Sequence, residues 1–328
     1  MQTIDTIVIG SSAGGVSTLS ALISKLPADL PAAIFVVMHF PEGATSVLPQ
    51  ILGRAGALKA KHATDGEEPN IGVVYVAPPG FHMILQKSAI RLAPGPKENA
   101  HRPSIDPLFR SAAHSRGRRV ISVILSGLLD DGTLGSMAVR RLGGLTLAQE
   151  PSEASFADMP RNAIEAGGIQ RVLSLDEIAD TLTQLSGKAV DESSNSEPPD
   201  PVEMSLEELS GLESRGRPSA FVCPECQGTL FELDEEGVMH YRCRVGHSYL
   251  AESLSSSQEN VMEAALWTAA RAIEEHNDLL TGMLERAERH GFSKSAKAYR
   301  SKLNLGLDRL EILRRALQVT RNAKEPET

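Results

Sequence analysis

Three polar side chains of this chain follow short apolar segments, and together they make up the residue set of a hydrolytic triad. Ser12 comes after the apolar segment Thr6–Ile9, in the run Gly-Ser-Ser-Ala-Gly-Gly. His39 ends a second apolar segment, and Asp131 follows a third, in Leu-Ser-Gly-Leu-Leu-Asp-Asp-Gly. A serine can attack a carbonyl carbon when a histidine takes its proton and an aspartate orients that histidine. The pattern therefore predicts acyl-transfer chemistry, with Ser12 as nucleophile, His39 as base and Asp131 as the partner of His39.

Each of these signals also has a simpler interpretation. A glycine-rich turn can bind phosphate or merely reverse the chain, although this one matches neither G-x-G-x-x-G nor the G-x-S-x-G elbow of lipase-type hydrolases. A histidine at a strand end is often a packing residue, and an Asp-Gly pair often only turns the chain. Because all three occur in a chain without a competing cofactor motif, the hydrolytic interpretation is favoured.

The elements that must position these residues belong to an α/β protein. Between Ile4 and Leu185, apolar segments alternate with helical and loop segments, which predicts a doubly wound, mostly parallel sheet with its site at the carboxyl ends of the strands. The apolar spacing of Val16–Leu26 predicts a helix directly after Ser12, and its first N–H groups favour negative charge. The predicted strands are Thr6–Ile9, Ala33–Met38, Gly72–Ala77, Val120–Leu125, Leu145–Ala148 and Arg171–Leu175.

A second cluster of chemically competent residues lies far along the chain. All three cysteines of the sequence fall in one short segment, in a C-x-x-C pair followed by C-x-x-x-H. This pattern predicts a structural Zn²⁺ site of three thiolates and one imidazole in a zinc ribbon, closed to water. No H-E-x-x-H pattern accompanies it, so we expect no cofactor in catalysis. The predicted ligands are Cys223, Cys226, Cys243 and His247.

Changes in composition divide the chain into four predicted parts. The catalytic domain covers residues 1–186, and an acidic flexible linker rich in Ser, Glu, Pro and Asp covers residues 187–218, with one short helical turn around 204–212. The zinc ribbon covers residues 219–250. Residues 251–328 carry apolar stripes at helical spacing on both sides of His290-Gly291, which predicts an antiparallel helical hairpin. The stripes pack on each other or form a surface for a signalling partner.

The overall composition limits the classes of function. The formal net charge of the 328 residues is -9, which gives little support to a nucleic-acid partner. Neither a signal peptide nor an apolar run long enough to span a bilayer is evident. Clustered cysteines indicate metal binding in a reducing compartment instead of disulfides. We therefore expect a cytoplasmic protein without a transmembrane segment.

Several separated motifs, in order along residues 4 to 185, resemble the catalytic domain of the chemotaxis protein-glutamate methylesterases of the CheB type. They are Ile-Gly-Ser-Ser-Ala-Gly-Gly at 9–15, the strand end at His39, His-Arg-Pro-Ser-Ile-Asp at 101–106, the Leu-Ser-Gly-Leu-Leu-Asp-Asp-Gly run at 125–132, and Met-Pro-Arg-Asn-Ala-Ile at 159–164. The resemblance implies a doubly wound parallel sheet and the triad Ser12, His39 and Asp131.

The resemblance also implies an activity and a partner. These enzymes hydrolyse γ-glutamyl methyl esters on methyl-accepting receptor proteins, and some also deamidate receptor glutamines. Near the site, we expect Gly14 and Leu128 to serve the oxyanion through backbone N–H groups, and Arg102 to contact acidic substrate. His82 is expected near the rim of the site. The family commonly has methionine where this chain has Leu128.

Two features depart from the family and leave questions open. The family usually carries an amino-terminal receiver domain, and because the catalytic strand begins within the first ten residues here, we expect none and place regulation in the carboxy-terminal half. Asp130 puts a second carboxylate beside Asp131, and the Gly132 that follows favours Asp131 as the partner of His39. The alternatives to a methylesterase are a non-catalytic signalling scaffold and a small-molecule serine esterase.

Overall fold

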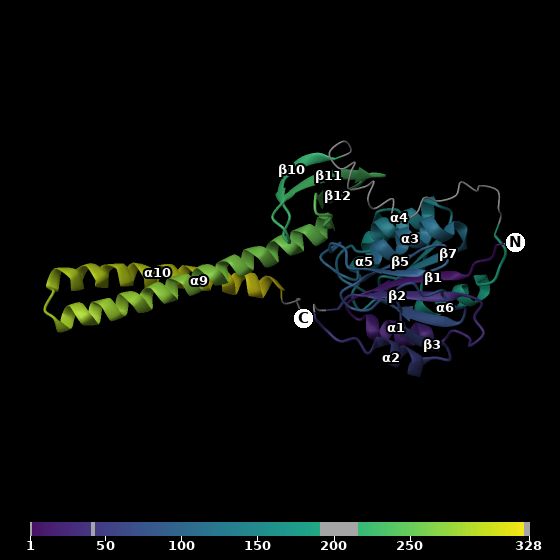
Figure 1. Ribbon diagram of the computed structural model, residues 1–328, viewed down its shortest axis with the longest axis horizontal. Helices are drawn as coiled ribbons and strands as arrows, with labels where there is room; N and C mark the ends of the chain where they lie inside the picture. The colour runs from purple at the N-terminus through teal and green to yellow at the C-terminus, as the bar shows by residue number, and fades with distance from the viewer. Residues whose placement is uncertain (1, 41–42, 191–215, 325–328) are drawn as a thin grey trace. The chain divides into compact units, whose positions relative to one another are not determined.

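A computed structural model describes residues 2–40, 43–190 and 216–324 of the chain (Figure 1). It divides into two compact units, Met1–Leu254 and Ser255–Thr328, and each is described by itself. Among the described helices, none is both long and apolar enough to cross a bilayer.

A seven-stranded parallel sheet forms the centre of the first unit. Its strands are β1 (Thr6–Ser11), β2 (Ala33–Met38), β3 (Lys59–His62), β4 (Val73–Val76), β7 (Val120–Ile124), β8 (Leu145–Gln149) and β9 (Arg171–Leu173). They lie in the order β3-β4-β2-β1-β7-β8-β9, so the direction in which the chain adds strands reverses at β1. In such sheets, ligands bind beyond the carboxyl ends of the strands at the point of reversal.

The central strands β1, β2 and β7 are buried throughout and mainly apolar because both faces of the sheet are covered. Alternate residues of β1 point to opposite sides: Ile7 and Ile9 join one apolar cluster, and Val8 joins the other. Helices cover both faces of the sheet in Figure 1. On one face lie α1 (Gly15–Ser24), α2 (Leu48–Ala55) and α6 (Leu175–Leu185), and on the other lie α3 (Ile105–Arg116), α4 (Thr133–Arg141) and α5 (Asp158–Glu165).

The predicted α/β class with a parallel sheet is confirmed, and all six predicted strands are present within two residues of their predicted ends. Three short strands were not predicted: β3 and the hairpin of β5 (His82–Leu85) and β6 (Ile90–Ala93). β3 is an edge strand with alternating exposure and two lysines, a composition that protects an edge but gives no apolar run.

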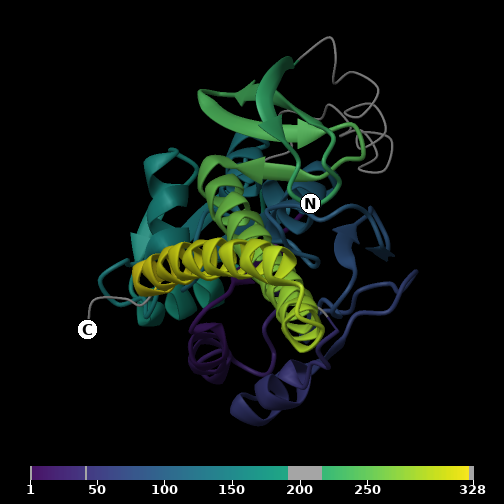
Figure 2. The same cartoon turned by 90° about the vertical axis from the view of Figure 1, so that its left-hand side faces the viewer.

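A small antiparallel sheet follows in the same unit, and Figure 2 shows it at the top in green. Its strands are β10 (Arg217–Val222), β11 (Thr229–Glu235), β12 (Val238–Cys243) and β13 (Ser248–Leu250). We call residues 216–250 the ribbon. β13 leads directly into the long helix α9 (Ala251–Arg289).

The second unit consists of the rest of α9 and α10 (Ser293–Lys324), which form the predicted helical hairpin. The two helices run alongside each other in Figure 1 and are joined by ion pairs of Arg300 with Glu288 and of Arg314 with Glu274. Gly306 allows a close approach, because a Cβ there would lie 1.9 Å from Oδ1 of Asn277.

The segment expected to be a linker differs at both ends from the prediction. Residues 187–190 belong to the first unit: the Lys188 carbonyl accepts from the N–H of Ile4, and the N–H of Val190 donates to Gln2. At the other end, Arg217 already begins β10. The helical turn predicted around 204–212 lies outside the described residues. The division of the chain at 186 and 250 stays a prediction, but the contacts described below join the ribbon to the sheet.

Candidate functional site

The three predicted triad residues come from three adjacent strands at the carboxyl edge of the sheet. Ser12 follows β1 directly, His39 follows β2 directly, and Asp131 lies in the loop between β7 and α4. β1 pairs with β2 on one side and β7 on the other, so their ends lie together. The reversal of strand order at β1 leaves this edge open to a ligand.

A continuous chain of hydrogen bonds joins these side chains. Nδ1 of His39 lies 3.1 Å from Oγ of Ser12, and Nε2 of His39 lies 2.7 Å from Oδ2 of Asp131. The Asp131 carboxylate can only accept, so it fixes the neutral imidazole with its hydrogen on Nε2. Nδ1 is then left to accept the Ser12 proton. The His39 and Asp131 side chains are only 6 % and 2 % exposed, which strengthens their interaction.

The two adjacent serines have different surroundings. The hydroxyl of Ser11 is buried and donates to the carbonyl of Ser126, 2.8 Å away, which ties the end of β1 to the loop after β7. Ser12 donates its backbone N–H to the same carbonyl and directs its hydroxyl at His39. Only Ser12 therefore has a base beside its hydroxyl.

Two glycines let the backbone approach Ser12 closely. Gly14 has φ 73°, the left-handed conformation that ends the turn and starts α1 at Gly15. A Cβ on Gly127 would lie 2.1 Å from the sulfur of Met159 and 3.0 Å from the Cβ of Ser12. A side chain at 127 would therefore push against the candidate nucleophile.

Asp131 is held at the amino terminus of α3. Its carboxylate accepts the N–H of Ile105 at 2.7 Å and of Asp106 at 3.1 Å, and the hydroxyl of Ser104 at 2.9 Å. Burial by itself raises the pKa of Asp131, but the hydrogen bond and charge of His39, followed by the Ile105 N–H, outweigh it and hold the pKa below its usual value. The carboxylate therefore stays ionised beside His39.

The neighbouring Asp130 faces the other way. Its carboxylate accepts the backbone N–H groups of Glu252 and Ser253, at 3.0 and 3.2 Å, and the Ser253 hydroxyl, at the start of α9. Burial raises the pKa of Asp130 to about 6. Two successive aspartates thus hold the first turns of two different helices, and only Asp131 contacts His39.

Four residues support the site, and sequence reasoning missed only Asn99, because His101 and Ser104 belong to the motif at 101–106 and His82 is expected near the site. Asn99 and Ser104 donate to Asp131, and His101 stacks on His39 with ring centroids 3.7 Å apart. His82 is buried, accepts the Ser104 N–H at Nδ1 and bonds through its other nitrogen to the Pro96 carbonyl. It therefore lies behind this loop and not at the rim. Ser104 carries a recognisable signal, since serine before an apolar helix is a common N-cap. Asn99 has none.

The predicted substrate contacts lie around this site. Leu128, 45 % exposed, is in the loop between β7 and Asp131, and Gly14 ends the turn that holds Ser12. The Arg102 guanidinium donates to the Gly95 carbonyl at 2.7 Å, so it is partly engaged in holding its own loop. The roles given to all three stay predictions.

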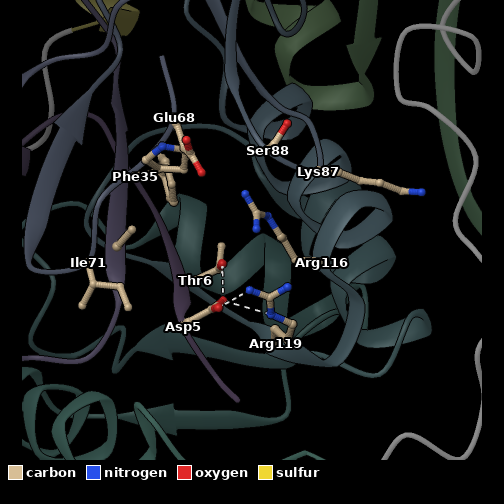
Figure 3. A pocket seen from close by; sticks show the side chains of 11 residues that line it. Asp5, Thr6, Phe35, Glu68, Ile71, Lys87, Ser88, Arg116 and Arg119 are labelled. Atoms are coloured by element: carbon tan, nitrogen blue, oxygen red, sulfur yellow. Dashed lines mark hydrogen bonds and ion pairs between the residues drawn. The ribbon is translucent and has the colours of Figure 1, made fainter. Parts of the chain in front are cut away.

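A pocket of about 240 Å³ opens at the opposite edge of the sheet, where β1 and β2 begin (Figure 3). Asp5, paired with Arg119, and the neighbouring Arg116 line it. Strands rise roughly 3.3 Å per residue, so the six residues of β1 separate this pocket from Ser12 by about 20 Å. The pocket is therefore not part of the triad site.

The ribbon brings together the four predicted metal ligands. The Sγ atoms of Cys223, Cys226 and Cys243 and a ring nitrogen of His247 all lie within 4.8 Å of one another. Individual separations are 3.6 Å for Cys226 to Cys243 and 3.5 Å for Cys243 to His247. Bonds of about 2.3 Å to sulfur and about 2.0 Å to nitrogen at tetrahedral angles give edges of roughly 3.5–3.8 Å. This cluster therefore fits a tetrahedral metal ion.

Together, the parallel sheet and the hydrogen-bonded Ser–His–Asp set at its carboxyl edge define an α/β protein with the site of a serine hydrolase. The CheB methylesterase family model matches residues 7–182, more than half of the chain, and the chain belongs to this family.

Individual relatives agree with this assignment. The chain is 39 % identical over 183 residues to protein-glutamate methylesterase/protein-glutamine glutaminase 2 of Anaeromyxobacter dehalogenans, covering 56 % of this chain and 54 % of that protein. A protein-glutamate methylesterase/protein-glutamine glutaminase of Archaeoglobus fulgidus is also 39 % identical over 183 residues, 55 % and 52 % of the two chains. The chain thus spans about half the length of these relatives.

Among solved structures, the chain is similar to the CheB methylesterase catalytic domain of Thermotoga maritima, with 36 % identity and a TM-score of 0.54. The match covers all of that chain and 56 % of this one. The family model ends at residue 182, before the ribbon and the helical hairpin.

Proposed function

We propose that this chain hydrolyses methyl esters of glutamate side chains in proteins. The observation that carries the proposal is the unbroken hydrogen-bond chain from Ser12 through His39 to Asp131 at the carboxyl edge of the sheet. The curated relatives are named for this activity, and the triad supplies a nucleophile, a base and a fixed carboxylate for it.

In the first half of the reaction, Ser12 becomes acylated. Its Oγ forms a bond to the ester carbonyl carbon while His39 Nδ1 takes its proton, and Asp131 stabilises the resulting imidazolium. The tetrahedral oxyanion lies at the start of α1, whose first N–H groups have no acceptor within the helix. We assign oxyanion donation to the N–H groups of Gly14 and Leu128. Collapse of the intermediate releases methanol, which takes the proton from His39.

In the second half, water attacks the acyl group on Ser12. His39 takes a proton from this water and returns one to the Ser12 oxygen as it leaves, which yields the glutamate carboxylate and the free enzyme. The same steps applied to a glutamine side chain release ammonia in place of methanol. The relatives' names include protein-glutamine glutaminase, so deamidation is the second candidate activity.

The protein substrate we assign is the methylated region of a methyl-accepting receptor in a chemotaxis-type pathway. Arg102 lies beside the loop that contacts the triad and is the cation we assign to acidic groups of the substrate. We place the reaction in the cytoplasm, where the three free cysteines would be kept reduced as metal ligands.

We further propose that Cys223, Cys226, Cys243 and His247 hold Zn²⁺. Three thiolates and one imidazole fill a tetrahedral shell and leave no position for water, so the ion would supply a structural cross-link and no step of the reaction. The fit of the four ligand atoms to tetrahedral edges supports this assignment.

Mass spectrometry of a methylated receptor incubated with the full chain tests the proposal. We expect loss of the methyl ester, slowed at least about a thousandfold by Ser12→Ala. Ser11→Ala is the matched control, since it removes an adjacent hydroxyl that donates to a carbonyl and faces no base. Demethylation that survives in Ser12→Ala contradicts the triad. Equal turnover of free methyl esters and receptor indicates a small-molecule esterase, and no turnover of either indicates a scaffold.

A further inference from the structure

One asparagine lies between the ribbon and the triad. The Asn99 amide donates from Nδ2 to Oδ1 of Asp131 at 3.0 Å and to Oδ2 of Asp106 at 2.9 Å. Its Oδ1 accepts the N–H of Leu250 at 3.1 Å, and its backbone N–H donates to the carbonyl of Ser248 at 2.7 Å. Asn99 is buried, and both ends of its side chain are engaged, one by a carboxylate of the triad and the other by β13 of the ribbon.

The same loop also contacts the base of the triad. His101 lies two residues after Asn99, bonds through Nδ1 to the Asn99 carbonyl, and stacks on His39 with the two rings 12° from parallel. Burial, followed by the charge of His39, lowers the pKa of His101 to about 4. Residues 97–101 therefore contact both Asp131 and His39, and their backbone bonds to Ser248 in β13 through the Asn99 N–H and the Lys97 carbonyl.

The position of β13 depends on the metal ligands. His247 directly precedes β13, and β12, which pairs with it, ends at Cys243. The Tyr249 hydroxyl of β13 lies 3.8 Å from Sγ of Cys223. One ligand therefore precedes the strand that holds Asn99, a second ends the strand paired with it, and a third lies beside its tyrosine.

Few apolar side chains help the ligands to fix β13. The buried apolar cluster around Tyr249 of β13 contains Leu230 and Leu254, and its remaining buried members are the ligands Cys223 and Cys243. Leu250 of β13 also packs against Leu134 and Met137 of α4. A module of this size does not bury enough apolar surface to fold alone, and metal binding supplies the missing free energy. A bound metal would cross-link the thiols of Cys223, Cys226 and Cys243, which no disulfide joins.

We propose that the metal-bound ribbon is a positioning element of the catalytic site: the metal orders β13, β13 holds Asn99, and Asn99 orients Asp131 toward His39. Asn99 is a positioning residue, since it acts on the reaction only through Asp131. Removal of the metal releases the Asn99 amide and lowers the reactivity of Ser12, although the metal contacts no reacting atom. The proposal rests on the triad chemistry proposed above.

Two measurements on the full chain test this proposal. Each is made with and without a zinc chelator, in the presence of a thiol reductant. The first is the rate at which a fluorophosphonate labels Ser12, which needs no natural substrate. The second is amide hydrogen exchange over residues 97–106. We expect metal removal to slow labelling at least about tenfold, because a hydrogen bond to a charged group is lost, and to speed exchange over this segment.

Variants distinguish loss of the hydrogen bonds of Asn99 from a general loss of structure. Asn99→Ala should retain the metal yet slow labelling as much as metal removal does, and removing the metal from Asn99→Ala should slow it little further, since both changes break one link. The matched control is Arg141→Ala, which removes ion pairs with Glu235 and Glu236 elsewhere in the ribbon and should leave both metal content and labelling unchanged.

The outcomes are distinct. If metal removal leaves either the labelling rate or the exchange rate unchanged, the proposal is overturned. It is also overturned if metal removal slows labelling of Asn99→Ala by the same factor as it slows labelling of the wild type. If the metal-loaded chain is not labelled at all, the triad chemistry fails. Exchange over 97–106 then decides the coupling alone, with metal-dependent protection supporting it and unchanged protection overturning it.

Discussion

The parallel sheet and the ribbon lie in one compact unit but are stabilised in different ways. The sheet buries two large apolar clusters, one on each face, and its central strands are covered on both sides. The buried cluster of the ribbon is small, and two of its members are candidate metal ligands. The triad therefore lies on the part with large apolar clusters, while a loop that contacts it is attached to the part for which we propose stabilisation by a metal.

Metal removal should separate the two regions most strongly. Binding of zinc to ligand sets of this kind contributes about 10 kcal/mol to folding. We therefore expect chelation to abolish amide protection in β11 to β13 while β1 and β2 stay protected, as measured by hydrogen exchange of the full chain. Equal loss of protection in both regions would contradict the comparison, and retained protection in the ribbon would show that burial suffices there.

The next largest effect should come from the two adjacent aspartates. Asp131→Asn removes the charge that fixes the His39 tautomer and should lower kcat about ten-thousandfold. Asp130→Asn, its matched control, changes the carboxylate that faces α9 and should lower kcat less than tenfold, roughly. The measurement is steady-state ester hydrolysis, and a larger loss in Asp130→Asn would reverse the assignment.

His101 should make stability depend on pH. Its pKa is lowered to about 4 in the folded chain, whereas the unfolded chain titrates near the ordinary 6.5. Between these values the unfolded chain binds more protons, so the free energy of unfolding should fall by up to about 3 kcal/mol as the pH decreases from about 6.5 to about 4. Denaturant unfolding of the full chain across this range measures the effect.

His101→Phe is the control for this dependence, because phenylalanine can stack on His39 but does not titrate. The stability difference between wild type and His101→Phe should change across the same pH range in favour of the variant at acid pH. A difference that stays constant with pH would show that His101 is not buried in its neutral form.

The smallest effect should come from the contact between Asp130 and the start of α9. Ser253→Ala removes one hydroxyl donated to Asp130 and should lower the free energy of unfolding by about 1 kcal/mol. Ser255→Ala, at an exposed position of the same helix, makes the same change in side chain without that contact. Equal effects of the two variants would mean that the contact contributes nothing.

Much of the fold could be predicted because burial on both faces leaves long apolar runs in the sequence. β1, β2 and β7 are buried throughout and consist mainly of apolar residues, and the glycine-rich turn after β1 marks the start of a helix. The edge strand β3 could not be found, since its alternating lysines carry no such run. The C-x-x-C and C-x-x-x-H spacing predicted which four side chains lie together in the ribbon.

The surroundings of the triad could not be predicted, because they depend on contacts between distant segments. Asn99 bonds to Asp131 and to Leu250, which are 32 and 151 residues away along the chain. No local pattern marks an asparagine with that role. The sequence favoured Asp131 over Asp130 through the Gly132 that follows, but the physical reason lies in two helices, α3 and α9, whose first turns the two carboxylates hold.

Trapping the acyl-enzyme tests the central claim, that Ser12 is a nucleophile activated by His39. The full chain is mixed with a methylated receptor peptide, quenched in acid within the first turnover, digested and analysed by tandem mass spectrometry. We predict a glutamyl adduct on the peptide that contains Ser12, mapped to its oxygen and absent in Ser12→Ala. Turnover without an adduct, or an adduct on any other residue, would contradict the account.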